Sequence, residues 1–274
     1  MIDLHLHTTA SDGRLAPDAL VARAAGLGLT TISVTDHDTT AGLTEAADAA
    51  TRHSVRLVPG IEITAVEDGR DVHMLGYFID TADPVLAGFL SAQRDVRVDR
   101  LRRIAGRLSE LGLPVDVDAA IDAATQAGRT VGRPLIADAM IACGYVASRR
   151  DAFDRWLAGG RPAFLARDGA SPQQVIDVVH GARGRISLAH PGRTGLADAR
   201  LRRLVDAGLD AIEVYHSDHD AAAVTRYASL ADDLGVLRTG GSDFHGDPNS
   251  PVMVGSSSLP TEHWARLRAS VVPC

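Results

Sequence analysis

Apolar and polar positions follow one another in a pattern that separates strands from helices at both ends of the chain. Short, β-branched apolar runs bounded by Gly, Pro or Asp are typical of buried strands, whereas apolar residues recurring every three or four positions are typical of helices. We expect strands at residues 1–6, 30–36, 56–64, 71–79, 185–189, 210–215 and 236–240. We expect helices at residues 17–28, 40–52, 172–183, 197–207 and 219–234.

A helical stretch interrupts this alternation in the middle of the chain. The pattern is helical from Pro84 to about Leu111, with no convincing strand in the region that follows. Further helices are expected at residues 117–127, 134–143 and 150–158. Because alternating strands and helices build an α/β layer, residues 1–97 and 166–274 are expected to form one α/β barrel-like domain. Residues 98–165 are expected to form a helical insertion domain.

The composition excludes several classes of protein. No apolar run approaches the roughly 18 residues needed to cross a membrane, and the N-terminus lacks the features of a signal peptide. The formal net charge of −7 argues against a broad surface for duplex nucleic acid. A phosphorylated substrate stays compatible, because bound metal ions supply local positive charge. The two cysteines, Cys143 and Cys274, predict neither a disulfide framework nor a thiolate metal site, and they favour the reducing cytoplasm.

Two histidines stand two residues apart in the first expected strand. Side chains alternate between the faces of a strand, so His5 and His7 share a face, roughly 6–7 Å apart along the backbone. Leu4 and Leu6 then face the apolar layer. Both imidazoles can turn onto one ion with bonds of about 2.1 Å. One such histidine is readily explained as a core residue, but two on one face at a strand end indicate a metal site.

The same signal recurs along the chain, at or near the ends of expected strands, where barrel active sites assemble. Glu62 is notable because an isolated carboxylate in a β-branched run is costly to bury unless it is paired or metal-bound. Imidazoles and carboxylates without thiolates suit Zn²⁺, Mn²⁺ or Fe²⁺, and the number of candidates indicates two or three ions. The candidate metal ligands are His5, His7, Asp12, His37, Glu62, His73, His190, Asp243 and His245.

These motifs resemble those of the PHP (polymerase and histidinol phosphatase) family of metal-dependent phosphoesterases. The segments DLHLHTTASDG, VTDHDT, PGIEIT, HMLGY, LAHPGR and GSDFHG occur in the family's order over nearly the whole chain. The stretch VGRPLIADAMIACGYV resembles the insertion of a subgroup containing 3′,5′-nucleoside bisphosphate phosphatases, some of which also trim 5′-phosphorylated RNA. Relatives often carry His after the GRP of this insertion, where the present chain has Leu135, and this departure leaves the substrate preference open.

The resemblance implies a distorted (β/α)₇ barrel with three divalent metal ions. Mn²⁺ is the leading candidate, with Zn²⁺ or Fe²⁺ as alternatives. Carried over by position, the first ion would be held by His5, His7, Glu62 and Asp243, the second by Glu62, His73 and His190, and the third by Asp12, His37 and His245.

The expected activity is hydrolysis of a phosphate monoester. The 3′-phosphate of a 3′,5′-bisphosphonucleoside is the leading substrate, and short 5′-phosphorylated RNA is a further one. Metal binding lowers the pKa of water from 15.7 towards about 7, so a hydroxide bridging two ions that share Glu62 would attack phosphorus. The ions would neutralise charge on the phosphoryl oxygens. Glu62 and Asp243 are the expected catalytic carboxylates.

Other side chains are candidates for contacts with the substrate. Arg193 and Arg133 are expected to grip phosphate through their planar guanidinium groups, with a surface or interdomain salt bridge as the alternative for each. His216 and His219 follow a strand and are expected to face the substrate. His219 is the candidate for protonating the leaving group, with a surface histidine at a helix start as the alternative.

Two further groups of charged residues have a structural interpretation. Asp36 and Asp38 flank His37 and are expected to orient it or to cap the following helix. The arginine-rich segment 94–107 is expected to form a solvated helix face with Asp–Arg pairs. Alternatively, some of its arginines guide an anionic substrate towards a cleft below the insertion.

Three other functions stay open on the sequence. A cyclic-phosphate phosphodiesterase of the same family would use the same cluster. Amidohydrolases also begin with His-x-His, but their common binuclear form needs a carbamylated lysine, and all 28 basic residues here are arginine. A mononuclear or Glu-bridged deaminase is still compatible with this composition. The last alternative, a catalytically silent PHP module such as that of some DNA polymerases, is disfavoured by the complete ligand set.

Overall fold

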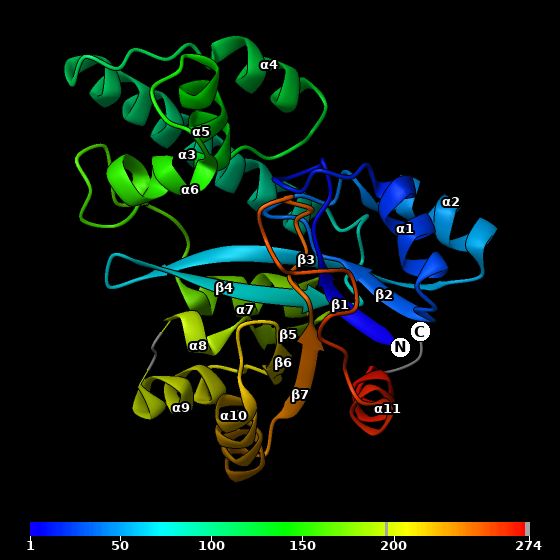
Figure 1. Ribbon diagram of the computed structural model, residues 1–274. Helices are drawn as coiled ribbons and strands as arrows, with labels where there is room; N and C mark the ends of the chain where they lie inside the picture. The colour runs from blue at the N-terminus through cyan, green and yellow to red at the C-terminus, as the bar shows by residue number, and fades with distance from the viewer. Residues whose placement is uncertain (195–196, 272–274) are drawn as a thin grey trace.

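The computed structural model describes residues 1–194 and 197–271 and consists of a barrel-like sheet surrounded by helices (Figure 1). Cys274 lies outside the described residues. The strands are β1 (Ile2–Leu6), β2 (Thr31–Val34), β3 (Arg56–Glu67), β4 (Arg70–Tyr77), β5 (Arg185–Leu188), β6 (Ala211–His216) and β7 (Leu237–Gly241). Each of these strands lies where the hydrophobic pattern predicts one.

Helices cover the sheet and form the insertion. Those packed around the barrel are α1 (Pro17–Gly26), α2 (Leu43–His53), α7 (Pro172–Gly181), α8 (Pro191–Thr194), α9 (Asp198–Asp206), α10 (Ala221–Leu234) and α11 (Thr261–Ala269). Those of the middle region are α3 (Pro84–Glu110), α4 (Asp118–Gln126), α5 (Arg133–Ala142), α6 (Arg149–Ala152) and the π-helical turn η1 (Phe153–Leu157). The pattern does not predict α8 or α11. Both are short, and α11 buries only Trp264 and Leu267.

The strands follow chain order across the sheet, and the sheet nearly closes on itself. After β7, the amide of Asp243 donates to the carbonyl of His5 (2.8 Å), and the amide of His7 donates to the carbonyl of Phe244 (3.0 Å). Gly241 permits this approach, because a Cβ there would lie 2.4 Å from the backbone nitrogen of His5. The expected distorted α/β barrel is confirmed.

The distortion comes from one reversed strand. β4 pairs antiparallel with both β3 and β5, whereas the other neighbouring strands run parallel. The hairpin between β3 and β4 turns at Asp68 and Gly69, which have φ values of 49° and 71°, as the two-residue Asp-Gly turns of hairpins require. Because β4 is reversed, its first residues lie beside the carboxyl ends of the parallel strands. We call this end of the barrel its mouth.

Helix α3 belongs to two cores at once. Its first half packs Leu86 and Leu90 against the barrel's strands and α7, whereas Leu101, Ile104 and Leu108 pack with the apolar residues of α4, α5 and η1. The insertion therefore has its own hydrophobic cluster above the barrel (Figure 1). The domain boundary expected near residue 98 falls inside a continuous helix. Within the described residues, no helix is both long and apolar enough to span a membrane.

Candidate metal centre

All nine candidate ligands converge at the mouth of the barrel. β1 brings His5, and the segment after it brings His7 and Asp12. The remaining ligands come from β3, from β4 and from the segments that follow β2, β5 and β7. Ring contacts link the histidines into a continuous cluster, with His7 stacked on His245 at 4.1 Å between centroids and His5 stacked on His190 at 5.8 Å. Segments far apart in sequence thus build one site.

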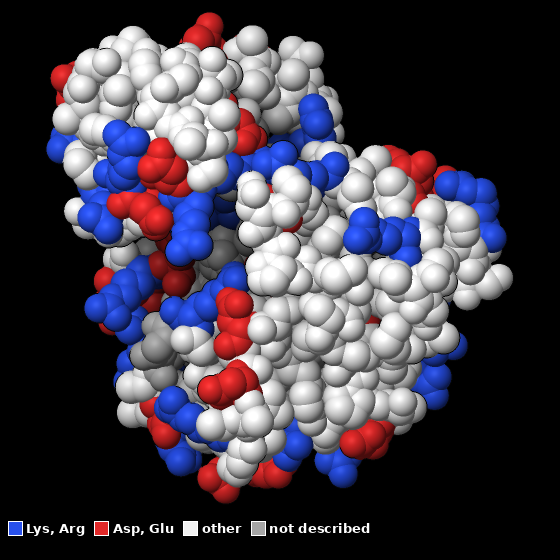
Figure 2. All heavy atoms as spheres, viewed as in Figure 1, with Lys and Arg blue, Asp and Glu red and all other residues white. Residues whose placement is uncertain are grey.

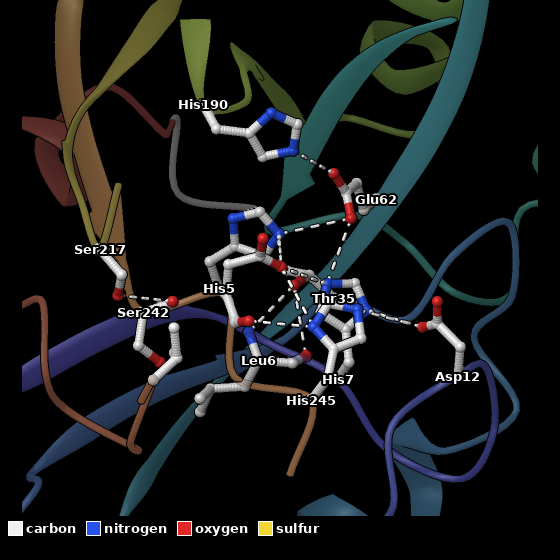
Figure 3. A network of polar contacts seen from close by, with 12 residues as sticks. His5, Leu6, His7, Asp12, Thr35, Glu62, His190, Ser217, Ser242 and His245 are labelled. Atoms are coloured by element: carbon white, nitrogen blue, oxygen red, sulfur yellow. Dashed lines mark hydrogen bonds and ion pairs between the residues drawn. The ribbon is translucent and has the colours of Figure 1, made fainter. Parts of the chain in front are cut away.

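Glu62 lies at the centre of this cluster (Figure 3). Its carboxylate is buried, and each of its two oxygens faces several imidazoles. Oε2 lies 3.3 Å from His5 Nε2, 3.2 Å from His7 Nε2 and 3.1 Å from His37 Nδ1. Oε1 lies 2.9 Å from His73 Nδ1 and 3.2 Å from His190 Nε2. Because imidazoles lie against both of its oxygens, Glu62 would be able to hold two ions, one on each side.

Two aspartates complete the arrangement on either side of His7. Asp243 Oδ1 lies 3.4 Å from His5 Nε2 and 3.3 Å from His7 Nε2. Asp12 lies 3.3 Å from His245 Nε2 and 3.8 Å from both His7 Nδ1 and His37 Nε2. Donor atoms gather within 4.8 Å of one another in the sets His5–His7–Glu62–Asp243, His7–Asp12–His37–His245 and His37–Glu62–His73.

These sets correspond closely, though not completely, to those implied by the family resemblance. The first set is the same. His7 joins the residues expected around the third ion, and His37 takes a place beside Glu62 and His73. His190 stays in contact with Glu62 but belongs to none of the compact groups.

Unsatisfied polar atoms inside the cluster test whether metal ions fit. Buried side-chain atoms without hydrogen-bond partners include His5 Nε2, both ring nitrogens of His7, His37 Nδ1 and Glu62 Oε2. Such atoms are rare in folded proteins because each costs free energy when it is desolvated and unpaired. Here they face one another, and divalent ions that prefer nitrogen and oxygen ligands would satisfy them. The donor set therefore fits the metal ions that the sequence implies.

The pKa values of groups in the cluster also indicate a site for metal ions. Burial raises the pKa of Glu62, but the imidazoles of His37, His73 and His5 outweigh burial and hold it well below its usual range. Conversely, burial lowers the pKa of His7, yet Asp243 and Glu62 raise it to about 10. Without metal ions, His7 thus binds its proton strongly, whereas burial lowers the pKa of His37 to about 3. Metal ions and protons compete for these atoms, so metal binding displaces protons.

The backbone turns sharply where strands deliver their ligands. His190 and Asp243 have φ values of 28° and 57°, in the left-handed region that residues other than glycine rarely occupy. Strain of this kind costs about 1–3 kcal/mol per residue and persists where the surrounding structure enforces it. Both residues lie two positions after the last residue of a strand, β5 or β7, and the turn aims their side chains back towards the cluster around Glu62.

Glu213, on β6, is a buried member of the site that the sequence reasoning missed. Its Oε1 lies 3.0 Å from His5 Nδ1, and its Oε2 accepts the backbone N–H of His190 (2.8 Å). The signal was available, because a lone Glu in the apolar run AIEVYH is the same anomaly as Glu62 in PGIEIT.

The expected substrate contacts lie in different surroundings. Arg193 donates to Asp243 Oδ2 (2.7 Å) and to Asp218, so its guanidinium is held at the edge of the cluster. His216 is buried, and its Nε2 lies 3.5 Å from Asp243 Oδ2. Arg133, at the start of α5, lines a pocket beside the cluster.

His219 does not have the geometry expected of a proton donor. Its Nδ1 donates to the carbonyl of Val214 (2.9 Å), and its Nε2 accepts the backbone N–H of Gly192 (3.2 Å). A Cβ on Gly192 would lie 2.8 Å from this ring. With both ring nitrogens bonded to the backbone, His219 supports the segment after β5 instead of facing the cluster with a free N–H.

The aspartates that flank His37 correct another expectation. Asp36 accepts hydrogen bonds from the Thr8 amide (2.7 Å) and from the Thr8 and Ser11 hydroxyls (both 2.6 Å), which fixes the loop leading to Asp12. Asp38 accepts from the Thr64 amide (3.1 Å) and pairs with Arg97 and Arg167. Neither caps α2, whose N-cap residue is Gly42.

Comparison with known proteins gives a consistent family. The PHP domain profile matches residues 3–187. The chain is 38% identical to a 5′-3′ exoribonuclease of Salmonella typhimurium, over 89% of this chain and 84% of the relative. It is 33% identical to a 3′,5′-nucleoside bisphosphate phosphatase of Chromobacterium violaceum, over 89% and 87%. It is 34% identical to a phosphoribosyl 1,2-cyclic phosphate 1,2-diphosphodiesterase of Eggerthella lenta, over 89% and 94%.

A solved structure is similar along its whole length. A Bifidobacterium adolescentis protein, named for metal-dependent phosphoesterase activity, superposes with a TM-score of 0.90 at 33% identity. The superposition covers 99% of this chain and 96% of that one.

Proposed function

The chain belongs to the PHP domain family and is a metal-dependent phosphoesterase, and on that premise we propose that it hydrolyses phosphate monoesters of nucleotides. The leading substrate is the 3′-phosphate of a 3′,5′-bisphosphonucleoside, with short 5′-phosphorylated RNA as a further one. The observation that carries the proposal is the buried cluster of imidazoles and carboxylates around Glu62, whose polar atoms lack partners within the protein.

We assign three divalent ions to this cluster, with Mn²⁺ as the leading candidate. Glu62 would bridge the two ions associated with His5, His7 and Asp243 and with His73 and His190. Asp12, His37 and His245 would hold the third. When bound, such ions lower the pKa of a coordinated water and neutralise charge on phosphoryl oxygens.

The protein's own groups prepare this site. The carboxylates of Glu62 and Asp243 stay ionised, because the pKa of each is held well below its usual range despite burial. Arg193 and His216 both face Asp243 Oδ2, which fixes the orientation of that carboxylate. Arg193 is half exposed, so its remaining donors are available to a phosphate at the mouth.

A cyclic-phosphate phosphodiesterase is the second candidate. It is favoured by the similarity to the Eggerthella lenta diphosphodiesterase, which covers as much of this chain as the similarity to the exoribonuclease does.

A phosphate-release panel tests the proposed function. Chelator-treated protein is reloaded with Mn²⁺ or Zn²⁺ and offered 3′,5′-bisphosphonucleosides, 5′-phosphorylated RNA oligomers, cyclic phosphates and sugar phosphates. We expect the fastest release from the bisphosphonucleosides and none after chelation. Chromatography of the products accompanies the phosphate assay, because opening a cyclic phosphate or cleaving RNA leaves a phosphate monoester and releases no free phosphate. Faster conversion of the cyclic phosphates would favour the second candidate. A fully metal-loaded protein that converts none of these compounds would contradict both.

A further inference from the structure

A pocket rich in arginine lies between the mouth of the barrel and the insertion. It has a volume of about 170 Å³ and shares Asp12, His37 and His73 with the metal centre. Four guanidinium groups line it, from Arg97, Arg100, Arg133 and Arg167. In the space-filling view, arginines gather with a few acidic residues around the hollow below the insertion (Figure 2).

We propose that this pocket binds a second, non-reacting phosphate group of the substrate while the metal centre holds the reacting one. The proposal rests on the proposed function, because it assigns two phosphate groups to one substrate molecule.

The charges in and around the pocket are unbalanced. Among the described residues lining the pocket or paired with its arginines, Asp38 binds both Arg97 and Arg167, and Asp71 lies 3.8 Å from Arg133. The guanidinium of Arg100 donates twice to the carbonyl of Leu165, at 3.0 and 2.8 Å, and has no carboxylate partner among the described ion pairs. Asp12, also in the wall, faces the histidines of the metal centre. The four arginines thus keep an excess of positive charge.

Two of the four arginines are buried. Arg100 and Arg167 are only 9% and 4% exposed. Burial, together with the neighbouring guanidinium of Arg133, lowers the pKa of Arg100 to about 10. Buried charges that are not balanced by a partner are costly. A phosphate group would offset this cost, and the planar arginine forks match its oxygens.

Contacts with neighbouring side chains already hold the arginines of the pocket in place. Arg97 is held by Asp38 and by the hydroxyl of Thr64 (2.9 Å). Arg133 lies over the rings of Phe153 and Phe164, at 5.5 and 5.9 Å from their centroids. Arg100 lies over Phe164 at 5.7 Å. Groups held in this way lose little freedom when an anion binds.

Size defines what the pocket holds. Pockets for complete small-molecule ligands usually have about 300–1,000 Å³, so this volume suits a phosphate group and not a whole nucleotide. The shared wall with His37 and His73 places the bound anion beside the cluster. A nucleotide carrying two phosphates would therefore reach both sites, and a monophosphate would satisfy only one.

Kinetics with matched substrates test the subsite. The ratio of kcat/KM for adenosine 3′,5′-bisphosphate to that for adenosine 3′-monophosphate is measured for the Mn²⁺-loaded wild type, Arg133→Gln and Arg103→Gln. Arg103 is exposed and lies 3.9 Å from Asp168, so its variant is the control. We expect Arg133→Gln to reduce the ratio about tenfold or more, as loss of a charge-assisted hydrogen bond does, while Arg103→Gln keeps it. An unchanged ratio in Arg133→Gln would overturn the proposal.

Binding without turnover separates this proposal from the proposed function. Calorimetry with the chelator-treated protein compares adenosine 5′-monophosphate with adenosine, so the difference reports the phosphate alone. We expect the phosphate to strengthen binding in the wild type and in Arg103→Gln, and much less in Arg133→Gln and Arg100→Met. If this pattern appears in a protein that hydrolyses neither adenosine 3′,5′-bisphosphate nor adenosine 3′-monophosphate, the subsite stands and the proposed function fails. If the phosphate adds nothing to wild-type binding, the subsite fails whatever the catalytic result.

Glu213 supports a second, independent inference. We infer that Glu213 is a positioning residue that orients ligands of two different ions. Its Oε1 faces His5 Nδ1, and its Oε2 accepts the amide of His190. A carboxylate that accepts the amide of His190 through Oε2 is placed to accept a second N–H, from His5 Nδ1, through Oε1. With its proton on Nδ1, His5 directs the lone pair of Nε2 at Glu62 and Asp243.

Exchange of Glu213 for glutamine tests this tautomer directly. The amide of Glu213→Gln can donate to Nδ1, which would move the proton of His5 to Nε2. We expect metal affinity, measured by chelator competition, to fall about 10–100-fold, and nitrogen NMR of the Zn²⁺-loaded protein, in which metal binding has displaced the extra proton, to show the altered His5 tautomer. Glu110→Gln, at the exposed end of α3, is the control. Wild-type affinity with an unchanged His5 tautomer in Glu213→Gln would refute the inference, and so would reduced affinity with the tautomer unchanged.

Discussion

Single residues determine whether the cluster is a metal site or a network of histidine–carboxylate hydrogen bonds. Asp243 is informative because both of its oxygens have partners. Oδ1 lies against the candidate ligands His5 and His7, and Oδ2 forms an ion pair with Arg193. In a plain hydrogen-bond network, an amide of the same size would keep some of these contacts. In a metal site, loss of the charge removes a ligand.

The Asp243→Asn variant should therefore keep its fold and lose most of its catalytic activity. We expect turnover to fall by more than about 100-fold, because removal of residues that only support the ligands already costs about 10–100-fold. Steady-state kinetics and elemental analysis of the same preparation measure the effect. Near-normal turnover with a full metal complement would exclude Asp243 from the site.

At this scale the sequence was informative where the chemistry was unusual for its surroundings. Paired histidines on a strand and a carboxylate in a β-branched run cost free energy on burial unless they have a partner or a bound metal ion. The structure brings all nine candidate ligands together. Roles that depend on where a side chain's hydrogen bonds point were harder to predict from the sequence. His219 has a suitable side chain and position in sequence, but its bonds to Val214 and Gly192 follow from the path of the backbone, which no residue pattern specifies.

At the scale of elements, strands and the long helices follow from periodicity, whereas closure of the barrel depends on contacts between distant segments. The hairpin at Asp68–Gly69 has a local signal, the Asp-Gly pair. The contact of β7 with β1 has almost none, since it needs only the absence of a side chain at Gly241. Helix α11 is not predicted, although α9, which has the same length and also buries two residues, is.

Gly241→Ala tests that contact. The added Cβ would lie 2.4 Å from the His5 backbone, which cannot move without shifting β1. We expect a loss of about 1–3 kcal/mol in the free energy of unfolding, as for overpacked cores. Urea denaturation measures it. Gly106→Ala, in α3 with nothing within 4 Å of the added Cβ, should instead be neutral or stabilising by up to about 1 kcal/mol. Equal stability of the two variants would show that the barrel seam adapts freely.

At the scale of the whole molecule, the metal centre and the fold should depend on each other. Ligands come from nearly every strand, and the metal-free cluster leaves buried atoms unpaired. Anything that binds the folded state alone stabilises it, by about 2.7 kcal/mol at a hundredfold excess over Kd. We therefore expect the Tm of chelator-treated protein to rise when Mn²⁺ is restored, as measured by calorimetry. Identical transitions with and without metal would mean that these atoms gain nothing from an ion.

A buried ion-pair group holds the two ends of the insertion, the residues just before and just after it, to the barrel. Asp38 follows β2 at the mouth, Arg97 lies on α3, and Arg167 follows the insertion, at 2.9 Å from Asp38 Oδ2. Since each comes from a different part of the chain, this group fixes the insertion over the metal centre and also shapes the wall of the arginine pocket. Breaking a buried pair leaves an uncompensated charge and typically costs about 3–5 kcal/mol.

Asp38→Asn should consequently destabilise the protein by about that amount at neutral pH, whereas Asp168→Asn, which removes an exposed partner of Arg103, should change the free energy of unfolding by less than about 1 kcal/mol. The difference should depend on pH in one direction. Burial raises the pKa of Asp38, but Arg97 and Arg167 outweigh it and hold the pKa below the ordinary value of 3.8. Its contribution is thus complete well above that value and is lost as the pH falls below it, because only the ionised form pairs. Urea titrations at several pH values should show the deficit of Asp38→Asn shrinking only in acid. A deficit that stayed constant into acid would show that packing of the side chain, and not its charge, joins the insertion to the barrel.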